Sequence, residues 1–264
     1  MSQEIGWTEK VAKEWRRYRP PSRPSLTEVR CYEHWFRRCK GKRVLILGST
    51  PELRDLAAKY RMETTVCDWS EGVFSALKIL MKHKDARETF VKQDWRTMQF
   101  QNQFDLIVGD CATTVVPFAD LDAVLRNIAQ GLDPGGVAVQ RIWTRYKDQQ
   151  YTPKSIASAF ATKGRAHWYT RMLFPVFLYY YSAEKESLSG QELYEKLRKD
   201  LENGTMPEKL VRLFSLVKNH KTQNNVLLRK DLEALLGKYF IILERMHGRD
   251  NFWTNAPIYV LKKK

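Results

Sequence analysis

Short apolar runs that alternate with helical segments are the feature of this sequence that most restricts its fold. Segments of helical character lie between them at 51–60, 70–83 and 121–132. Repeated strand–helix order with short connections predicts a doubly wound α/β fold, with a parallel sheet and right-handed crossovers. Five runs read as strands buried on both faces: 43–48, 64–68, 89–94, 104–110 and 136–143.

The alternation of predicted strands and helices stops after Trp143 and resumes near the end of the chain. A helix is predicted at 226–239, and strands follow at 240–246 and 256–263 with a short turn between them. Such a hairpin predicts one antiparallel strand in a mostly parallel, seven-stranded sheet. The chain therefore divides into three predicted parts: an N-terminal helical segment (1–42), a core (43–143 and 226–264) and a helix-rich insertion (144–225).

Within the N-terminal segment, helical stretches flank a proline-rich break at 19–24. Ser25 and Glu28 have the spacing of a capping box, in which each side chain bonds the other's free backbone N–H. The spacing predicts that a helix starts at Ser25.

The formal net charge of +15 is distributed unevenly. Residues 1–43 carry +7, residues 44–143 carry −2 and residues 144–264 carry +10. A nearly neutral core between basic flanks suits an anionic partner such as nucleic acid, but a solvated basic surface explains the same charge more simply.

Two further properties of the chain restrict its location and its metal chemistry. No run reaches the roughly 18 apolar residues that cross a bilayer, and the N-terminus lacks a signal-peptide pattern, so no membrane span and a cytoplasmic location are expected. The cysteines lack zinc-ligand spacing, which predicts reduced thiols and no metal site: Cys31, Cys39, Cys67 and Cys111.

Polar and aromatic residues collect at the predicted strand ends. The first strand ends in a tight turn, Gly48–Ser49–Thr50, before a helix N-terminus that suits a carboxylate or a phosphate. Asp68 follows Gly48 by twenty positions, the place of an acceptor for a ribose diol. The other strand ends hold Trp69, Asp94, Trp95, Asp110 and Cys111. Together these residues predict a site for a nucleoside cofactor.

At these residues the sequence resembles class I S-adenosylmethionine (SAM)-dependent methyltransferases. The resemblance covers 44–57, 66–70, 91–95, 104–110, 132–140 and the terminal helix and hairpin. It implies SAM as the cofactor, with the methionine part against Gly48, Ser49 and Thr50. It also implies that the ribose binds Asp68 near Trp69 and Ser70, that adenine lies near Asp94 and Trp95, and that Asp110 and Cys111 border the reactive methyl.

The glycine-rich turn departs from the family pattern. Ile46 stands where the family has an acid, and Thr50 and Glu52 stand where it has two further glycines. Asp110 or Glu52 is therefore expected to hold the amino group of SAM. Other nucleotide folds fit less well, because the chain lacks G-x-G-x-x-G, the P-loop and the G-x-S-x-G elbow.

The acceptor of the methyl group is predicted to be a small molecule held under the insertion as a helical lid. Trp15, Tyr18 and Arg23 are expected to help close the N-terminal segment over the cofactor. The catalytic base is not identified, but His167, Tyr169 and Asp110 are candidates. Predicted acceptor contacts are Tyr18, His167, Tyr169, Arg171 and Trp253.

Two alternatives stay open. The basic flanks favour an RNA- or protein-directed methyltransferase, and the reduced glycine motif favours a SAM-binding protein without turnover. Aromatic residues in the insertion at 166–181 also suit a simple hydrophobic core. The sequence makes no prediction of the oligomeric state.

Overall fold

The computed structural model describes residues 9–147, 150–162, 167–181, 187–250, 252 and 254–264. One seven-stranded sheet has the order β10-β11-β5-β4-β1-β2-β3. β1, β2, β3, β4 and β5 pair in parallel, whereas β11 is antiparallel to both β5 and β10. The predicted mostly parallel sheet with an antiparallel final strand is confirmed. Its strands are β1 (Arg43–Leu47), β2 (Glu63–Asp68), β3 (Glu88–Lys92), β4 (Phe104–Asp110), β5 (Leu132–Arg141), β10 (Phe240–Met246) and β11 (Ile258–Lys263).

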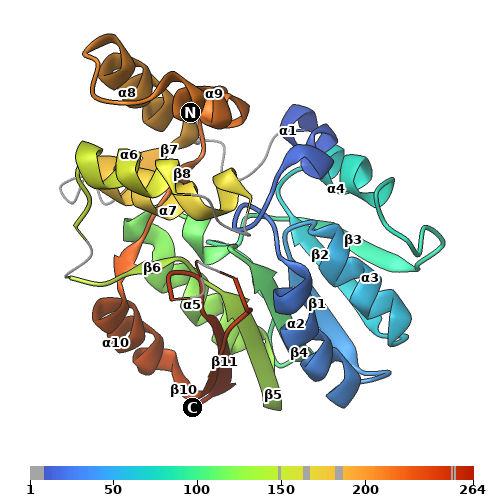
Figure 1. The fold of residues 1–264 in the computed structure, drawn as a ribbon. Coiled ribbons are helices and arrows are strands. Elements are labelled where there is room, and N and C mark those ends of the chain that lie inside the picture. Colours follow the sequence, from blue (N-terminus) through green and yellow to red (C-terminus); the bar gives the residue numbers. More distant parts are fainter. Residues whose placement is uncertain (1–8, 148–149, 163–166, 182–186, 251, 253) are drawn as a thin grey trace.

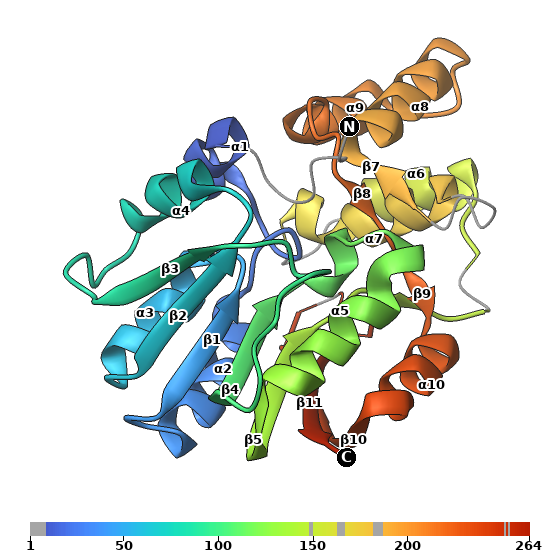
Figure 2. The ribbon, with the colours of Figure 1, turned by 180° about the vertical axis from the view of Figure 1, so that it is seen from behind.

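Helices cover both faces of the sheet. α2 (Leu26–Arg38) and α3 (Pro51–Lys59) lie on one face, and α5 (Phe118–Gly131) lies on the other (Figures 1 and 2). α10 (Arg229–Tyr239) packs with α5 in the same core cluster. The alternating strand residues explain these two layers, because Leu45 and Leu47 face the α5 side while Val44 and Ile46 face α2 and α3.

The predicted capping box at the start of α2 is confirmed. Ser25 Oγ accepts a hydrogen bond from Glu28 N at 3.2 Å, and Glu28 Oε2 accepts one from Ser25 N at 2.8 Å. Before this helix the chain forms α1 (Glu9–Lys13) and the short 3-10 helix η1 (Trp15–Arg17). α1 packs against α4 (Glu71–Lys78), whereas α2 packs against α3, so the N-terminal segment contacts both of these helices (Figure 1).

The insertion lies at one end of the sheet (Figure 1) and shares a hydrophobic cluster with residues outside it, among them Tyr18, Trp143 and Phe252. Tyr169, Phe174 and Phe177 from the ring-rich run are buried in this cluster, so most of those rings act in packing. No helix among the described residues has the length and apolar character to cross a membrane. The insertion contains α6 (Pro153–Ala161), α7 (Trp168–Tyr180), α8 (Gly190–Glu202), α9 (Glu208–Leu213) and η3 (Phe214–Val217). The remaining short elements are η2 (Thr113–Val115), β6 (Thr144–Arg145) paired with β9 (Leu227–Leu228), and β7 (Leu188–Ser189) paired with β8 (Gln223–Asn224).

Candidate functional site

A pocket lies where β1, β2 and β4 end, beside the point at which the strand order reverses between β1 and β4. The pocket together with its open mouth encloses about 590 Å³ of empty space, which includes open solvent at the mouth. Its walls combine strand ends, α4, η2 and the N-terminal segment. The lining residues are Trp15, Ser22, Leu47, Gly48, Ser49, Thr50, Asp68, Trp69, Val73, Leu77, Trp95, Asp110, Cys111, Ala112 and Val115.

The turn after β1 forms one wall. Gly48 has a φ of 83°, a left-handed conformation that favours glycine. A Cβ at this position would meet the Trp95 ring only at an ordinary van der Waals distance of 3.7 Å, so the backbone conformation is what favours glycine. The turn leads to Thr50, whose side chain makes no capping hydrogen bond, so the N-terminus of α3 retains free backbone donors near the pocket.

Asp68 at the end of β2 is 5% exposed. Its Oδ2 accepts a hydrogen bond from Ser49 Oγ at 2.6 Å, and its Oδ1 accepts one from Ser70 N at 3.3 Å. Burial raises the pKa of this carboxyl to about 6. Ser70 itself does not line the pocket, because its Oγ caps α4 by accepting from Val73 N at 3.2 Å.

Two tryptophans lie in the pocket wall. Trp95 is 8% exposed, and its Nε1 donates to Cys67 O at 2.9 Å. The Nε1 of Trp69 is buried and makes no hydrogen bond. Asp94 does not line the pocket, and its carboxylate accepts from Arg96 Nη2 at 2.6 Å. The structure therefore brings Trp69 and Trp95 to the pocket but leaves Asp94 outside it.

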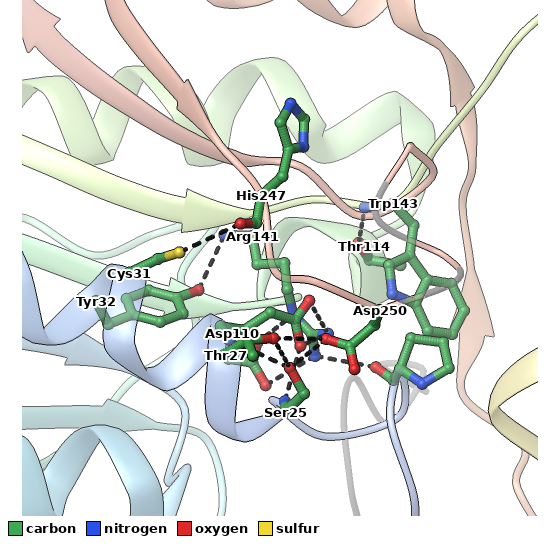
Figure 3. Close-up of polar contacts among 12 residues, drawn as sticks. Ser25, Thr27, Cys31, Tyr32, Asp110, Thr114, Arg141, Trp143, His247 and Asp250 are labelled. Carbon is green, nitrogen blue, oxygen red and sulfur yellow. Dashed lines mark hydrogen bonds and ion pairs between the residues drawn. The ribbon is translucent and has the colours of Figure 1, made fainter. Parts of the chain in front are cut away.

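Asp110 lies at the end of β4 in a fully buried ion network (Figure 3). Its Oδ1 and Oδ2 accept from Arg141 Nε at 2.5 Å and Nη2 at 3.2 Å. Arg141 Nη1 also lies 3.0 Å from both carboxylate oxygens of Glu28, and its Nη2 donates to Pro21 O at 2.9 Å. Asp110 reaches the pocket with both oxygens already engaged.

The same network joins four segments of the chain. Tyr32 of α2 donates to Gly109 O at 2.8 Å, and its oxygen accepts from Arg141 N at 3.1 Å (Figure 3). Ser25 Oγ and Thr27 Oγ1 donate to Asp250 Oδ2 at 2.5 and 2.9 Å. Helix α2, the ends of β4 and β5 and the loop after β10 are therefore held in one arrangement beside the pocket.

The prediction from sequence missed Arg141 and the second role of Glu28. A single arginine inside the apolar run 136–143 is the signal that points to a buried ion pair, since an unpaired charge there is too costly.

Cys111 follows Asp110 in a left-handed conformation with a φ of 58°, unusual for a residue with a side chain. Its backbone N–H donates to Arg141 O at 3.0 Å, which holds this turn against the end of β5. Burial raises the pKa of the Cys111 thiol above its ordinary range. The thiol is therefore protonated near neutral pH and forms part of the pocket wall.

The predicted acceptor contacts are mostly engaged in structural bonds. Tyr18 OH lies 2.5 Å from His220 Nε2, and Tyr169 OH lies 2.9 Å from Ser22 Oγ. His167 is exposed at the start of α7, where its Nδ1 accepts from Tyr169 N at 3.2 Å. Arg171 donates to two backbone carbonyls at the end of α6, at 2.7 and 3.0 Å.

None of these four residues lines the pocket, although Tyr169 contacts Ser22, which does. Trp253 lies outside the described residues. Within the described residues, no group of three or more His, Cys, Asp or Glu side chains is arranged to hold a metal ion.

The comparison with protein families covers this same region. A family profile described as "Methyltransferase domain" matches residues 47–136, from the last residue of β1 into β5. That segment contains the Gly48 turn, Asp68 and Asp110. Residues 47–136 are thus similar to a methyltransferase domain, and they lie within a sheet of the class I, Rossmann-like type. The match supports S-adenosylmethionine as the cofactor of this domain.

Solved structures share the fold of this chain. A Rhodobacter sphaeroides protein, provisionally described as a Zn-dependent alcohol dehydrogenase, matches with a TM-score of 0.61 and 13% identity over 97% of this chain and 99% of that one. The CcbJ methyltransferase from Streptomyces caelestis matches with a TM-score of 0.59 and 12% identity over 96% of each chain.

A third structure is the Burkholderia thailandensis 1,6-didemethyltoxoflavin-N1-methyltransferase with bound 1,6-didemethyltoxoflavin and S-adenosylhomocysteine. Its TM-score is 0.54 at 9% identity, over 100% of this chain and 93% of that one. Identities this low show a shared fold. No curated protein sequence matches this chain significantly.

Proposed function

We propose that this chain is a SAM-dependent methyltransferase that transfers the methyl group to a small-molecule acceptor. The observation that carries the proposal is the meeting of three strand ends in one pocket: the Gly48 turn, the buried Asp68 and the Asp110–Cys111 turn. Ligands of open α/β sheets bind at such a point, where the strand order reverses.

The lining suggests how the cofactor lies. Asp68 is placed to accept hydrogen bonds from the ribose hydroxyls, as Ser49 already orients its carboxylate. Trp69 and Trp95 offer apolar surface for the adenine ring. The Gly48–Thr50 turn and the free N-terminus of α3 then face the methionine part.

The chemistry requires little from the protein beyond alignment and exclusion of water. The bound cofactor supplies a methyl group already activated on a sulfonium. Cys111 is a protonated wall residue, and the Asp110 carboxylate is held by Arg141, so neither side chain is free to act as a nucleophile. A negative carboxylate beside the sulfonium favours the charged cofactor.

Two segments are proposed to close the site. Trp15 and Ser22 of the N-terminal segment line the pocket, and Ser22 contacts Tyr169 of the insertion. Tyr18 reaches His220, also in the insertion, at 2.5 Å. These contacts support a strap (1–42) over the cofactor and a lid (144–225) over the acceptor.

The RNA- or protein-directed alternative is tested by following the methyl group. SAM labelled on the methyl would be incubated with the enzyme and with separate low-mass, RNA and protein fractions of a cell extract. We expect label to enter the low-mass fraction, and Asp68→Ala to reduce this transfer by about tenfold or more at SAM concentrations below saturation. Label in RNA or protein would overturn the small-molecule proposal, and bound SAM with no transfer to any fraction would indicate a binding protein.

A further inference from the structure

Glu52 occupies an unusual place in the cofactor-binding turn. It stands in the first turn of α3, two positions after Thr50 of the Gly48–Thr50 wall. Ile46, in β1 just before the same turn, has an apolar side chain that is fully buried in the sheet. The turn therefore has an apolar side chain on its strand side, at Ile46, and a carboxylate on its helix side, at Glu52.

Two buried polar atoms, one on Glu52 and one on Arg23, lack a hydrogen-bond partner. Its Oε1 accepts from Trp15 Nε1 at 3.1 Å, whereas its Oε2 is buried without a hydrogen-bond partner. Arg23 Nη1 lies 4.0 Å from Oε1, too far for a hydrogen bond, and Arg23 Nε is also buried without a partner. A buried acceptor and a buried donor left unpaired are costly, which points to a ligand that pairs with both.

The location of this pair fits the pocket. Trp15, Ser22 and Thr50 all line the pocket, and each is adjacent to the pair: Trp15 by its hydrogen bond to Glu52, Ser22 as the neighbour of Arg23, and Thr50 two positions before Glu52. Neither Glu52 nor Arg23 lines the pocket itself; both lie next to wall residues, behind the turn that is proposed to face the methionine part.

Asp110, the other acidic candidate, is already satisfied. Both of its oxygens accept hydrogen bonds from Arg141, so an ammonium group would compete with a buried guanidinium. Glu52 has a free buried oxygen instead. We propose that Glu52 Oε2 binds the α-ammonium of the cofactor while Arg23 binds its α-carboxylate. This inference rests on the proposed SAM site.

The physical basis is charge complementarity. The amino-acid end of the cofactor carries an α-ammonium and an α-carboxylate. The ammonium pairs with the Glu52 carboxylate, and the carboxylate pairs with the Arg23 guanidinium. A loose ion pair at 4.0 Å is thereby replaced by two charge-assisted hydrogen bonds.

The experiment compares two ligands by calorimetric titration: S-adenosylhomocysteine, which has the amino-acid end, and 5′-methylthioadenosine, which lacks it. We expect wild type to prefer the first, and Glu52→Gln to weaken it by about tenfold or more while leaving the second unchanged, since a hydrogen bond to a charged group is lost. Arg23→Gln should act in the same selective way, and it preserves the test if Glu52→Gln fails to fold.

Glu71→Gln is the matched control, because Glu71 is an exposed acid in the first turn of the neighbouring helix α4. We expect it to alter neither affinity. If the variants bind both ligands equally more weakly, or if neither Glu52→Gln nor Arg23→Gln changes the affinity for S-adenosylhomocysteine, the proposed roles of Glu52 and Arg23 are wrong. Either result would leave the proposed SAM site standing. Folded wild type that binds neither ligand would overturn the proposed function itself.

Discussion

Arg141 donates to Asp110 through Nε at 2.5 Å and through Nη2 at 3.2 Å, with both side chains buried. The pair joins the ends of β5 and β4, and Glu28 adds a second carboxylate 3.0 Å from the same guanidinium. Because these charged side chains are buried, removing any one of them would leave an unpaired charge. The ion network therefore stabilises the pocket wall only while all its members are present.

Replacing the central arginine should strongly destabilise the protein. Arg141→Met leaves two buried carboxylates without their cation, so we expect the free energy of unfolding to fall by about 3 to 5 kcal/mol. Urea denaturation measures this loss. Arg245→Met is the control, since Arg245 pairs with Glu233 at a partly exposed site and its loss should cost less than about 1 kcal/mol. Similar costs for the two variants would contradict the assigned support role.

Stability should depend on pH through Asp68. Burial raises its folded-state pKa to about 6, above the value of about 3.9 expected in the unfolded chain. The group thus contributes stability below about pH 4 that is lost as pH rises through 6, by up to about 3 kcal/mol. Asp68→Asn should flatten that part of the pH profile of unfolding free energy and make the ligand-free protein more stable at pH 7. An identical slope in wild type and variant between pH 4 and 7 would show that this carboxyl is not perturbed.

The turn after β4 should prefer glycine to alanine at Cys111. Because its φ is 58°, a side chain there costs about 1 kcal/mol, so we expect Cys111→Gly to be more stable than Cys111→Ala by about that amount. Cys67, buried in β2 with no such turn, provides the opposite control: its glycine variant should be the less stable one. Thermal unfolding of the four variants compares the two sites, and the same order at both would refute the strain.

Tyr169 should be dispensable for proton transfer. Burial raises its pKa to about 12, so the phenol stays neutral near pH 7 and cannot accept a proton. We expect Tyr169→Phe to keep methyl transfer to the low-mass fraction within about threefold, while losing about 1 kcal/mol of stability with the contact to Ser22. His167→Ala is measured beside it, and a loss of a hundredfold or more in Tyr169→Phe alone would identify the phenol as a catalytic group.

The sheet and the pocket-lining strand ends could be predicted because both follow from local patterns. Apolar runs and helical segments alternate by regular periods, and parallel strands bring their carboxyl ends to one edge, which places Asp68 beside the Gly48 turn. A capping box joins residues three positions apart, so the Ser25–Glu28 pair could also be predicted from its spacing in the sequence.

Long-range ion pairs could not be predicted in the same way. Glu28 and Arg141 are 113 positions apart, and only the fold brings them together. Asp94 shows the converse, because Arg96 two positions later binds its carboxylate and leaves it outside the pocket. The same holds for Arg171, whose guanidinium binds the end of α6.

Calorimetric titration of S-adenosylhomocysteine into wild type and Asp68→Ala tests the central claim most directly. We expect wild type to bind with a stoichiometry of one, and Asp68→Ala to remain folded but bind at least about tenfold more weakly, because the ribose loses a buried carboxylate acceptor. Equal affinity in the two proteins, or folded wild type that shows no binding at millimolar ligand, would contradict the proposed site.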